Sequence, residues 1–253
     1  MSENPISKLG ADDFRAFLSD NESRKAFMEA VISVFDEDLL GKRFDSYNID
    51  AIGFLAAAVT SSEYAARHMV NAHRANSDLD LLKFSVDSIT INGLILEFGV
   101  SEGRTVNYIA DLLPGKKIYG FDSFQGLPEK WRPGFDKGAF SRSEPPSVRD
   151  NVELIVGWFD RTLPIFRDSH PDQKAALIHI DCDIYLSAQI ALYNMKNYIV
   201  PGSIIVFDEY FNYPGWRRHE FRSFKDFVKA NRIHYEYIGL VPHHQQVAVR
   251  ILG

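Results

Sequence analysis

The chain has 253 residues, of which 45% are hydrophobic and 25% charged, a composition typical of a globular protein. This length suits one large domain with an extension, or at most two small domains. The formal net charge of -6 provides no overall positive field for a polyanion, so nucleic acid is not an expected partner. Cys182 is the only cysteine and cannot form an internal disulfide. Because no run approaches the ~18 to 20 apolar residues that cross a bilayer, and the N-terminus lacks a leader pattern, we expect a cytoplasmic protein with no membrane segment.

Residues 1–85 are expected to form a helical extension. Apolar residues such as Phe14, Phe17 and Phe27 recur there at roughly helical spacing among charged ones. The stretch 51–66 is rich in alanine and other small residues, which favours close packing in the core and also permits contact with a second subunit. We therefore expect a helical extension over residues 1–85, a single α/β domain over residues 86–253, and a homo-oligomer.

From residue 89 onward the pattern changes to short apolar runs, each followed by a helix-like stretch. Continuous apolar strands that alternate with helices predict a parallel sheet covered on both faces. In such sheets, ligands bind outside the carboxyl ends of the strands. The residues just after each run are therefore the candidates for a site. The expected strands cover residues 93–98, 117–121, 152–156, 176–180, 203–207 and 247–251.

A glycine-containing loop follows the first run, in the order Glu97, Gly99, Gly103, Thr105. Glycine allows a sharp strand-to-helix turn and a close approach of the backbone to a ligand, and the following helix N-terminus offers unpaired N–H groups. The spacing E-x-G-x-x-x-G differs from the G-x-G-x-x-G of dinucleotide binders. An acidic Glu97 suits a cationic amino group, such as that of S-adenosylmethionine. A purely structural turn is the alternative.

Asp122 and Ser123 end the second run, with Asp122 about 20 residues after the glycine loop. A carboxylate at this position can accept hydrogen bonds from both hydroxyls of a ribose. The alternative is that Asp122 caps the next segment. After the third run, Gly157 and Trp158 introduce an aromatic side chain that either stacks beside an adenine or fills the core.

Four carboxylates follow the fourth and fifth runs, at Asp181, Asp183, Asp208 and Glu209. Four like charges at one sheet edge are unfavourable unless a cation or a shifted protonation compensates them. Mg²⁺, which prefers oxygen ligands, is the natural candidate for that cation. The alternative is that Asp183 and Glu209 are solvated loop charges.

Several phrases in combination resemble one known family. The phrases LEFGVSEGRTV, YGFDSFQGLPE, GWFDRTLP, IDCDIYLSA, PGSIIVFDEYF and HQQVAVRI, spread over residues 93–252, look like the macrocin O-methyltransferase family. The resemblance implies a Rossmann-like class I methyltransferase fold with helices on both faces of the sheet. It also implies S-adenosylmethionine as cofactor, and Mg²⁺-assisted methylation of a sugar hydroxyl.

The resemblance also implies roles for individual residues. Asp181, Asp208 and Glu209 match the family's metal ligands, and Asp183 matches its proposed general base. Members of that family carry two aspartates where this chain has Asp208 and Glu209, which puts metal binding in question. The residues that we expect to bind the cofactor are Glu97, Gly99, Gly103, Thr105, Asp122, Ser123, Gly157, Trp158 and Asp181.

Two other functions fit parts of the pattern. Asp181 and Asp183 form a D-x-D pair, as in metal-dependent nucleotide-sugar enzymes, although the glycine loop and Asp122 argue against that assignment. A cofactor-binding protein without turnover is the second alternative. The sequence leads us to expect a small-molecule acceptor, a sugar or a natural-product glycoside, without identifying it.

Overall fold

The computed structural model describes residues 48–253, together with Glu22 and Lys25. Residues Ala56–Gly253 form one compact unit, which contains an eight-stranded sheet in the order β1-β7-β8-β6-β5-β2-β3-β4. The strands are β1 (His73–Arg74), β2 (Leu94–Phe98), β3 (Ile118–Asp122), β4 (Val152–Val156), β5 (Ala175–Ile180), β6 (Ile204–Phe207), β7 (Tyr235–Leu240) and β8 (Val247–Ile251). The helices are α3 (Ile49–His68), α4 (Asp78–Asp87), α5 (Arg104–Leu112), α6 (Phe159–Ser169), α7 (Tyr185–Asn194) and α8 (Glu220–Asn231), with a short 3₁₀ helix η3 (Trp216–Arg218).

The order of the strands reverses at β2, although the strands themselves stay parallel there. From β2 it runs outward through β3 to β4, and it then returns to place β5 on the other side of β2, followed by β6. All these pairings are parallel. A reversal of strand order of this kind opens a crevice at the carboxyl ends of the strands. The loops after β2, β3, β5 and β6 meet there.

The expectation of a parallel sheet is wrong for one strand. β8 pairs antiparallel with both β6 and β7. A short connection, residues 241–246, joins β7 to β8, and a connection of this length can join only antiparallel neighbours. The sheet is therefore mixed, with the start of the antiparallel strand β8 beside the end of β6.

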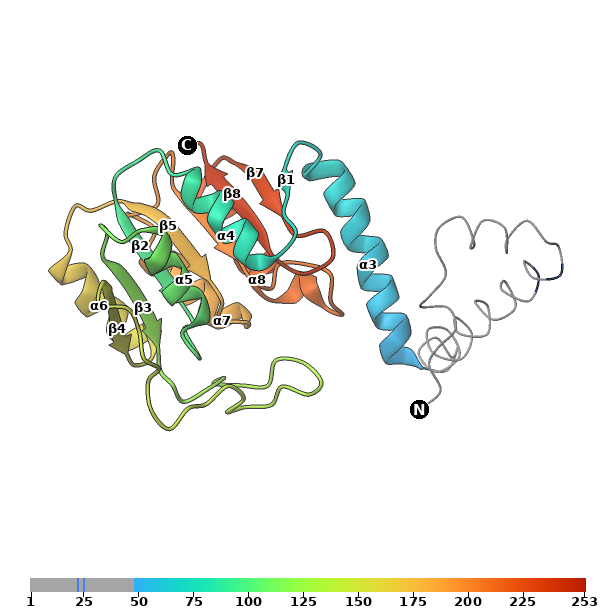
Figure 1. Cartoon of the computed structure of the whole chain (residues 1–253), viewed down its shortest axis with the longest axis horizontal. Helices are drawn as coiled ribbons and strands as arrows, with labels where there is room; N and C mark the ends of the chain where they lie inside the picture. Colours follow the sequence, from blue (N-terminus) through green and yellow to red (C-terminus); the bar gives the residue numbers. More distant parts are fainter. Residues whose placement is uncertain (1–21, 23–24, 26–47) are drawn as a thin grey trace. The chain divides into compact units, whose positions relative to one another are not determined.

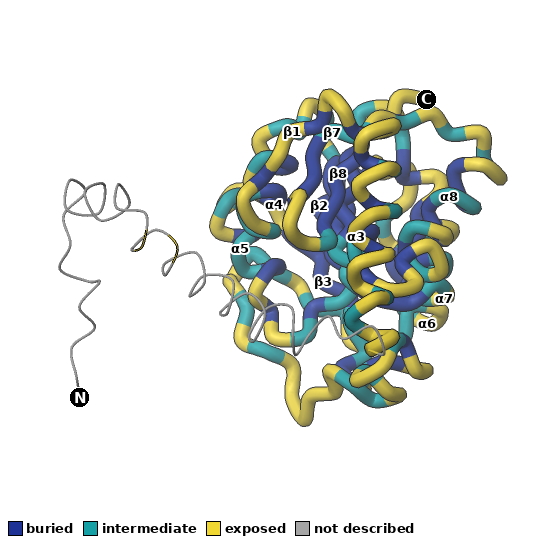
Figure 2. Tube along the Cα trace, turned by 90° about the vertical axis from the view of Figure 1, so that its right-hand side faces the viewer, coloured by how far each residue is buried: buried dark blue, intermediate teal, exposed yellow. Residues whose placement is uncertain are grey.

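Helices cover both faces of the sheet. Apolar residues of α4 and α5, including Leu81 and Ile109, pack on one face, and Figure 1 shows these two helices across it. Residues of α6, α7 and α8, including Phe166, Leu192 and Phe227, pack on the other face. In Figure 2 the strands form the buried interior between helices that are exposed on their outer sides. The continuous apolar runs follow from this burial on two faces.

Each of the six expected strands is present, with bounds that differ by at most one residue. β1 and β7 were not expected. The helical extension is partly described: α3 and α4 lie within residues 48–87, whereas Phe14, Phe17 and Phe27 lie outside the described residues. The boundary expected at residues 85 and 86 stays a prediction. No helix in the described part of the chain is long and apolar enough to cross a membrane.

Candidate functional site

The loop after β2 requires glycine at one position. Gly99 has φ +94°, and a Cβ atom there would lie 1.6 Å from the carbonyl oxygen of Asp181, on the neighbouring strand's extension. No side chain fits in that space. Gly103, with φ +78°, precedes the first residue of α5. The backbone between these glycines can therefore approach a ligand at the N-terminus of α5.

Asp122, the last residue of β3, organises that loop. Its Oδ2 accepts hydrogen bonds from the backbone N–H groups of Val100 at 2.8 Å and Ser101 at 2.9 Å. Its Oδ1 accepts one from Phe124 N–H at 2.7 Å. Asp122 thus does cap the segment that follows it, and it also fixes the glycine loop. The preference for a carboxylate at this position has a structural cause in addition to any role toward a ribose.

A cavity of about 620 Å³ opens at the carboxyl ends of the strands. It runs from the glycine loop to the acidic residues after β5 and β6, so one cavity reaches both groups of predicted site residues. The predicted residues that line it are Gly99, Asp122, Ser123, Gly157, Trp158, Asp181, Asp183 and Glu209. The predicted residues outside its lining are Glu97, Gly103, Thr105 and Asp208.

Glu97 lies inside the sheet and is fully buried. Its Oε1 accepts a hydrogen bond from Thr105 Oγ1 at 3.1 Å, and its Oε2 lies 2.9 Å from His179 Nδ1. Burial disfavours a charged His179, but the hydrogen bond and the negative charge of Glu97 outweigh burial and raise the pKa of His179. Both carboxylate oxygens of Glu97 have partners within the protein, and its role toward a cofactor amino group stays a prediction.

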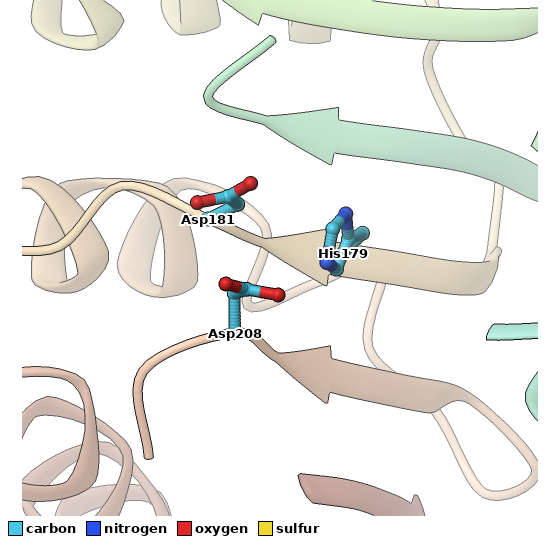
Figure 3. A group of neighbouring side chains, drawn as sticks. All are labelled: His179, Asp181 and Asp208. Carbon is cyan, nitrogen blue, oxygen red and sulfur yellow. The ribbon is translucent and has the colours of Figure 1, made fainter. Parts of the chain in front are cut away.

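Asp181 and Asp208 come together at the ends of adjacent strands (Figure 3). With His179 they form a group whose possible metal-ligating atoms all lie within 4.8 Å of one another. Burial, followed by the charges of Asp208 and Asp183, raises the pKa of Asp181 well above its usual range. A divalent cation between these carboxylates would remove the repulsion that this rise reflects.

Glu209 adds a further carboxylate to the same edge. It lines the cavity, and its Oε2 is buried with no hydrogen-bond partner among the described residues. The charges of Asp208, Asp183 and Asp181 act on Glu209. Among the described residues, however, the group of close ligating atoms consists of His179, Asp181 and Asp208 and does not include Glu209. Asp181 and Asp208 are therefore the carboxylates whose oxygens suit a cation such as Mg²⁺, and the role of Glu209 as a ligand stays a prediction.

Asp183 differs from its neighbours in conformation and environment. It has φ +63°, which is uncommon for a non-glycine residue, and its side chain is buried at the cavity wall. Burial and the charge of Asp208 raise the pKa of Asp183 to about 7, against the opposing charge of Arg132. A strained, buried carboxylate facing a cavity is a common feature of functional sites.

Sequence reasoning missed three residues near this edge. His179 lies directly opposite Glu97 in the register of β2 and β5. A single histidine inside an otherwise apolar strand was the signal that could have revealed it, whereas its pairing with Glu97 depends on the register. Glu220 is fully buried and accepts hydrogen bonds from the loops after β5 and β6. Arg132 stacks over Trp131 at 3.8 Å from the ring centroid. No local pattern in the sequence indicates the last two.

Comparison with known proteins agrees with this geometry. Residues 96–210 match a family model described as a methyltransferase domain. A sequence relative from Streptomyces olivaceus, 8-demethyl-8-(2,3-dimethoxy-alpha-L-rhamnosyl)-tetracenomycin-C 4'-O-methyltransferase, is 27% identical over an alignment that covers 52% of this chain. The chain spans 59% of the length of that relative.

Two solved structures share the fold. The calicheamicin methyltransferase CalS11 matches with a TM-score of 0.55 at 20% identity, covering 96% of this chain and 98% of its own. The O-methyltransferase NovP matches with a TM-score of 0.55 at 18% identity, covering 83% of this chain and 100% of its own. The chain thus has the Rossmann-like fold of class I methyltransferases, and its residues 96–210 match a methyltransferase domain. The expected fold class is confirmed, and the domain match agrees with the expected enzyme class.

Proposed function

We propose that this chain transfers the methyl group of S-adenosylmethionine to a hydroxyl oxygen of a glycosylated small molecule, assisted by Mg²⁺. One observation carries the proposal: a single cavity extends from Gly99 and Asp122 to Asp181 and Asp183. A methyl donor at the glycine loop and an acceptor at the carboxylates would therefore share one cavity. Such proximity supplies a large part of the rate of a transfer between two bound reactants.

The glycine-loop side takes the methyl donor in this proposal. Asp122 and Ser123 line the cavity and would bind the ribose, and Trp158, which also lines it, would stack beside the adenine. Gly99 and Gly157 keep the backbone open, each with a positive φ. The proposal assigns four further residues to the donor side. Asp181 lines the cavity, next to the acidic side, whereas Glu97, Gly103 and Thr105 lie outside the cavity lining and would support the glycine loop.

Asp183 is the general base of the proposed reaction. The acceptor oxygen forms a bond to the methyl carbon as the bond from that carbon to sulfur breaks, and the electron pair of the broken bond remains on sulfur. The hydroxyl proton passes to Asp183, which lines the cavity. A bound Mg²⁺ ion would lower the pKa of the hydroxyl. Asp181, Asp208 and Glu209 would hold that ion.

The acceptor class rests on the relative and on the cavity. The Streptomyces olivaceus relative is named as a 4'-O-methyltransferase of a rhamnosyl-tetracenomycin C. Phe140, Leu186 and Ile190 give the cavity of this chain an apolar wall, which suits an acceptor with an apolar body and a polar hydroxyl. We therefore propose a sugar hydroxyl on such a molecule.

Calorimetry with S-adenosylhomocysteine tests the cofactor assignment directly. We expect binding, and no comparable heat with a nucleoside diphosphate. The reverse result would favour the nucleotide-sugar interpretation of Asp181 and Asp183. Absence of heat with either ligand from a folded protein would overturn the proposal, and binding without turnover on any glycoside acceptor would favour a non-catalytic protein.

Metal removal tests the second part of the proposal. With an identified acceptor, methyl transfer should stop in excess EDTA and return on addition of Mg²⁺. Asp181→Asn keeps the side-chain size and removes one charge, so metal affinity and turnover should fall together. Undiminished transfer in EDTA would leave the carboxylates with only a hydrogen-bonding role toward the acceptor.

We also propose that the chain self-associates, because the alanine-rich stretch 51–66 permits close contact with a second subunit. In α3, Val59 is half exposed, whereas Ala57 and Ala65 are buried in the core. A second copy of the chain would cover apolar residues of the exposed side. Light scattering at micromolar concentration is the measurement, and a monomer would contradict the proposal.

A further inference from the structure

Glu220 connects the two loops that carry the acidic residues. It is the first residue of α8 and is fully buried. Its Oε1 accepts hydrogen bonds from the backbone N–H groups of Cys182 and Asp183, both at 3.2 Å. Its Oε2 accepts one from Glu209 N–H at 3.1 Å. One carboxylate thus joins the loop after β5 to the loop after β6.

An acidic residue at a helix N-terminus often interacts only with the dipole and N–H groups of its own helix. Glu220 differs, because the hydrogen bonds that its carboxylate accepts from described residues come from two other segments. Glu220 lies 38 residues after Cys182 and 37 residues after Asp183, so these hydrogen bonds are tertiary contacts. Helix capping therefore does not account for the arrangement.

The two loops need such a connection. They carry Asp181, Asp183, Asp208 and Glu209, and burial, followed by the charges of neighbouring acidic groups that include Glu220 itself, raises the pKa values of Asp181 and Glu209. The N–H that Asp183 donates to Glu220 also belongs to a residue with φ +63°. Such a conformation persists only where surrounding contacts hold it. Hydrogen bonds from both loops to one rigid helix oppose separation of the loops and retain the turn at Asp183.

We propose that Glu220 is a positioning residue, which holds the loop after β5 to the loop after β6 so that Asp183 and Glu209 face the same cavity. Its relevance to methyl transfer rests on the proposed function, whereas the connection between the loops does not. Glu220 contacts neither reactant in this proposal. It acts through the backbone of the residues that do.

Hydrogen exchange of the full-length protein, followed by mass spectrometry, tests this connection. Glu220→Ala removes both acceptor oxygens, so segments 181–184 and 208–210 should each exchange about tenfold faster, as expected when a hydrogen bond that each loop donates is lost. Glu220→Gln keeps one acceptor oxygen and replaces the other with an amide that cannot accept. We expect faster exchange in just one of the two segments.

Ser223→Ala is the matched control. Ser223 lies one turn further along α8, is fully buried, and its Oγ has no hydrogen-bond partner among the described residues. This variant should exchange like the wild type in both segments. If Glu220→Ala does not fold, Glu220→Gln decides the question, because it keeps the size of the side chain. Wild-type exchange in both segments of folded Glu220→Gln, or equal acceleration throughout the domain, would overturn the proposal.

Ligand binding separates this role from general stabilisation. Calorimetry with Mn²⁺ should show at least about tenfold weaker binding to Glu220→Gln, with affinity for S-adenosylhomocysteine within about twofold of the wild type. Equal weakening of both ligands would indicate a merely structural role and contradict positioning. If neither ligand binds the wild type, the proposed function fails, and the exchange result still decides the role of Glu220.

Discussion

On the side of the cavity formed after β2 and β3, the backbone defines the shape: Gly99 leaves room for the neighbouring strand, and Asp122 binds three N–H groups of its surroundings. On the side formed after β5 and β6, side chains define it, and three of them, Asp181, Asp183 and Glu209, are acidic. The first side is complete through its own hydrogen bonds. The second retains an orphaned carboxylate oxygen on Glu209 and raised pKa values for Asp181 and Glu209, which either protonation or a bound cation would satisfy.

This difference implies different sensitivities on the two sides. Substitutions on the backbone-defined side should change stability or cofactor affinity, because its residues hold the chain in a conformation. Substitutions on the acidic side should change turnover and metal affinity, because its carboxylates repel one another and contribute little to stability. Single substitutions on each side test that contrast.

The largest effect is expected on the acidic side. Asp183→Asn removes the proposed general base at nearly constant size and should lower kcat by about 10²- to 10⁴-fold. Metal affinity should change less than in Asp181→Asn, since Asp183 is not a proposed ligand. Steady-state kinetics with an identified acceptor and calorimetry with Mg²⁺ provide the two values. Loss of metal binding equal to that of Asp181→Asn would reassign Asp183 to the metal site.

The next largest effect is expected from Gly99→Ala. A left-handed backbone costs an L residue about 1–2 kcal/mol, and overlap with a backbone oxygen cannot be relieved by a side-chain rotation, so we expect a loss of at least about 3 kcal/mol. Gly134→Ala is the control, because Gly134 has φ +87° and open space around its Cβ position. Urea unfolding measures the free energy of unfolding of both variants. Equal losses would show that the loop after β2 yields to the new methyl group.

Asp122→Asn should have an intermediate effect. It removes the charge that holds Val100 N–H and Ser101 N–H, and it removes the proposed partner of the ribose hydroxyls. Affinity for S-adenosylhomocysteine should fall by about 1.5–3 kcal/mol, the range for hydrogen bonds to a charged group. Calorimetry compares the two proteins. Unchanged affinity would leave Asp122 with its structural role alone.

The strands and the glycine loop could be predicted because their signals are local. A strand buried on both faces is continuously apolar, as in residues 175–180, and a turn that excludes every side chain requires glycine, as at Gly99. β7 was missed because it lies near the sheet edge and is partly exposed on one face, so polar residues interrupt its pattern. The direction of β8 was missed because it follows from the short connection after β7.

The contacts between distant segments could not be predicted. Glu97 meets His179 through the register of two strands 82 residues apart. Glu220 meets the acidic loops through the docking of α8. Both glutamates are buried charged residues without a motif around them, and only tertiary packing assigns them partners. The sequence therefore indicated which residues lie at the site more fully than which residues hold the site together.

The smallest effect is expected where a loop closes one side of the site. The guanidinium of Arg132 lies 3.8 Å from the ring centroid of Trp131 and 5.0 Å from those of Phe135 and Tyr213. Cation–π contacts contribute about 0.5–2 kcal/mol, so Arg132→Met should lose about 1 kcal/mol of local stability. Amide exchange in residues 127–141 should then be several-fold faster, with the rest of the domain unchanged.

The control is Arg142→Met, in the same loop. Arg142 makes a 3.4 Å ion pair with an exposed Glu102, and exposed ion pairs contribute little to stability. Equal exchange in the two variants would show that the rings hold this loop without the cation.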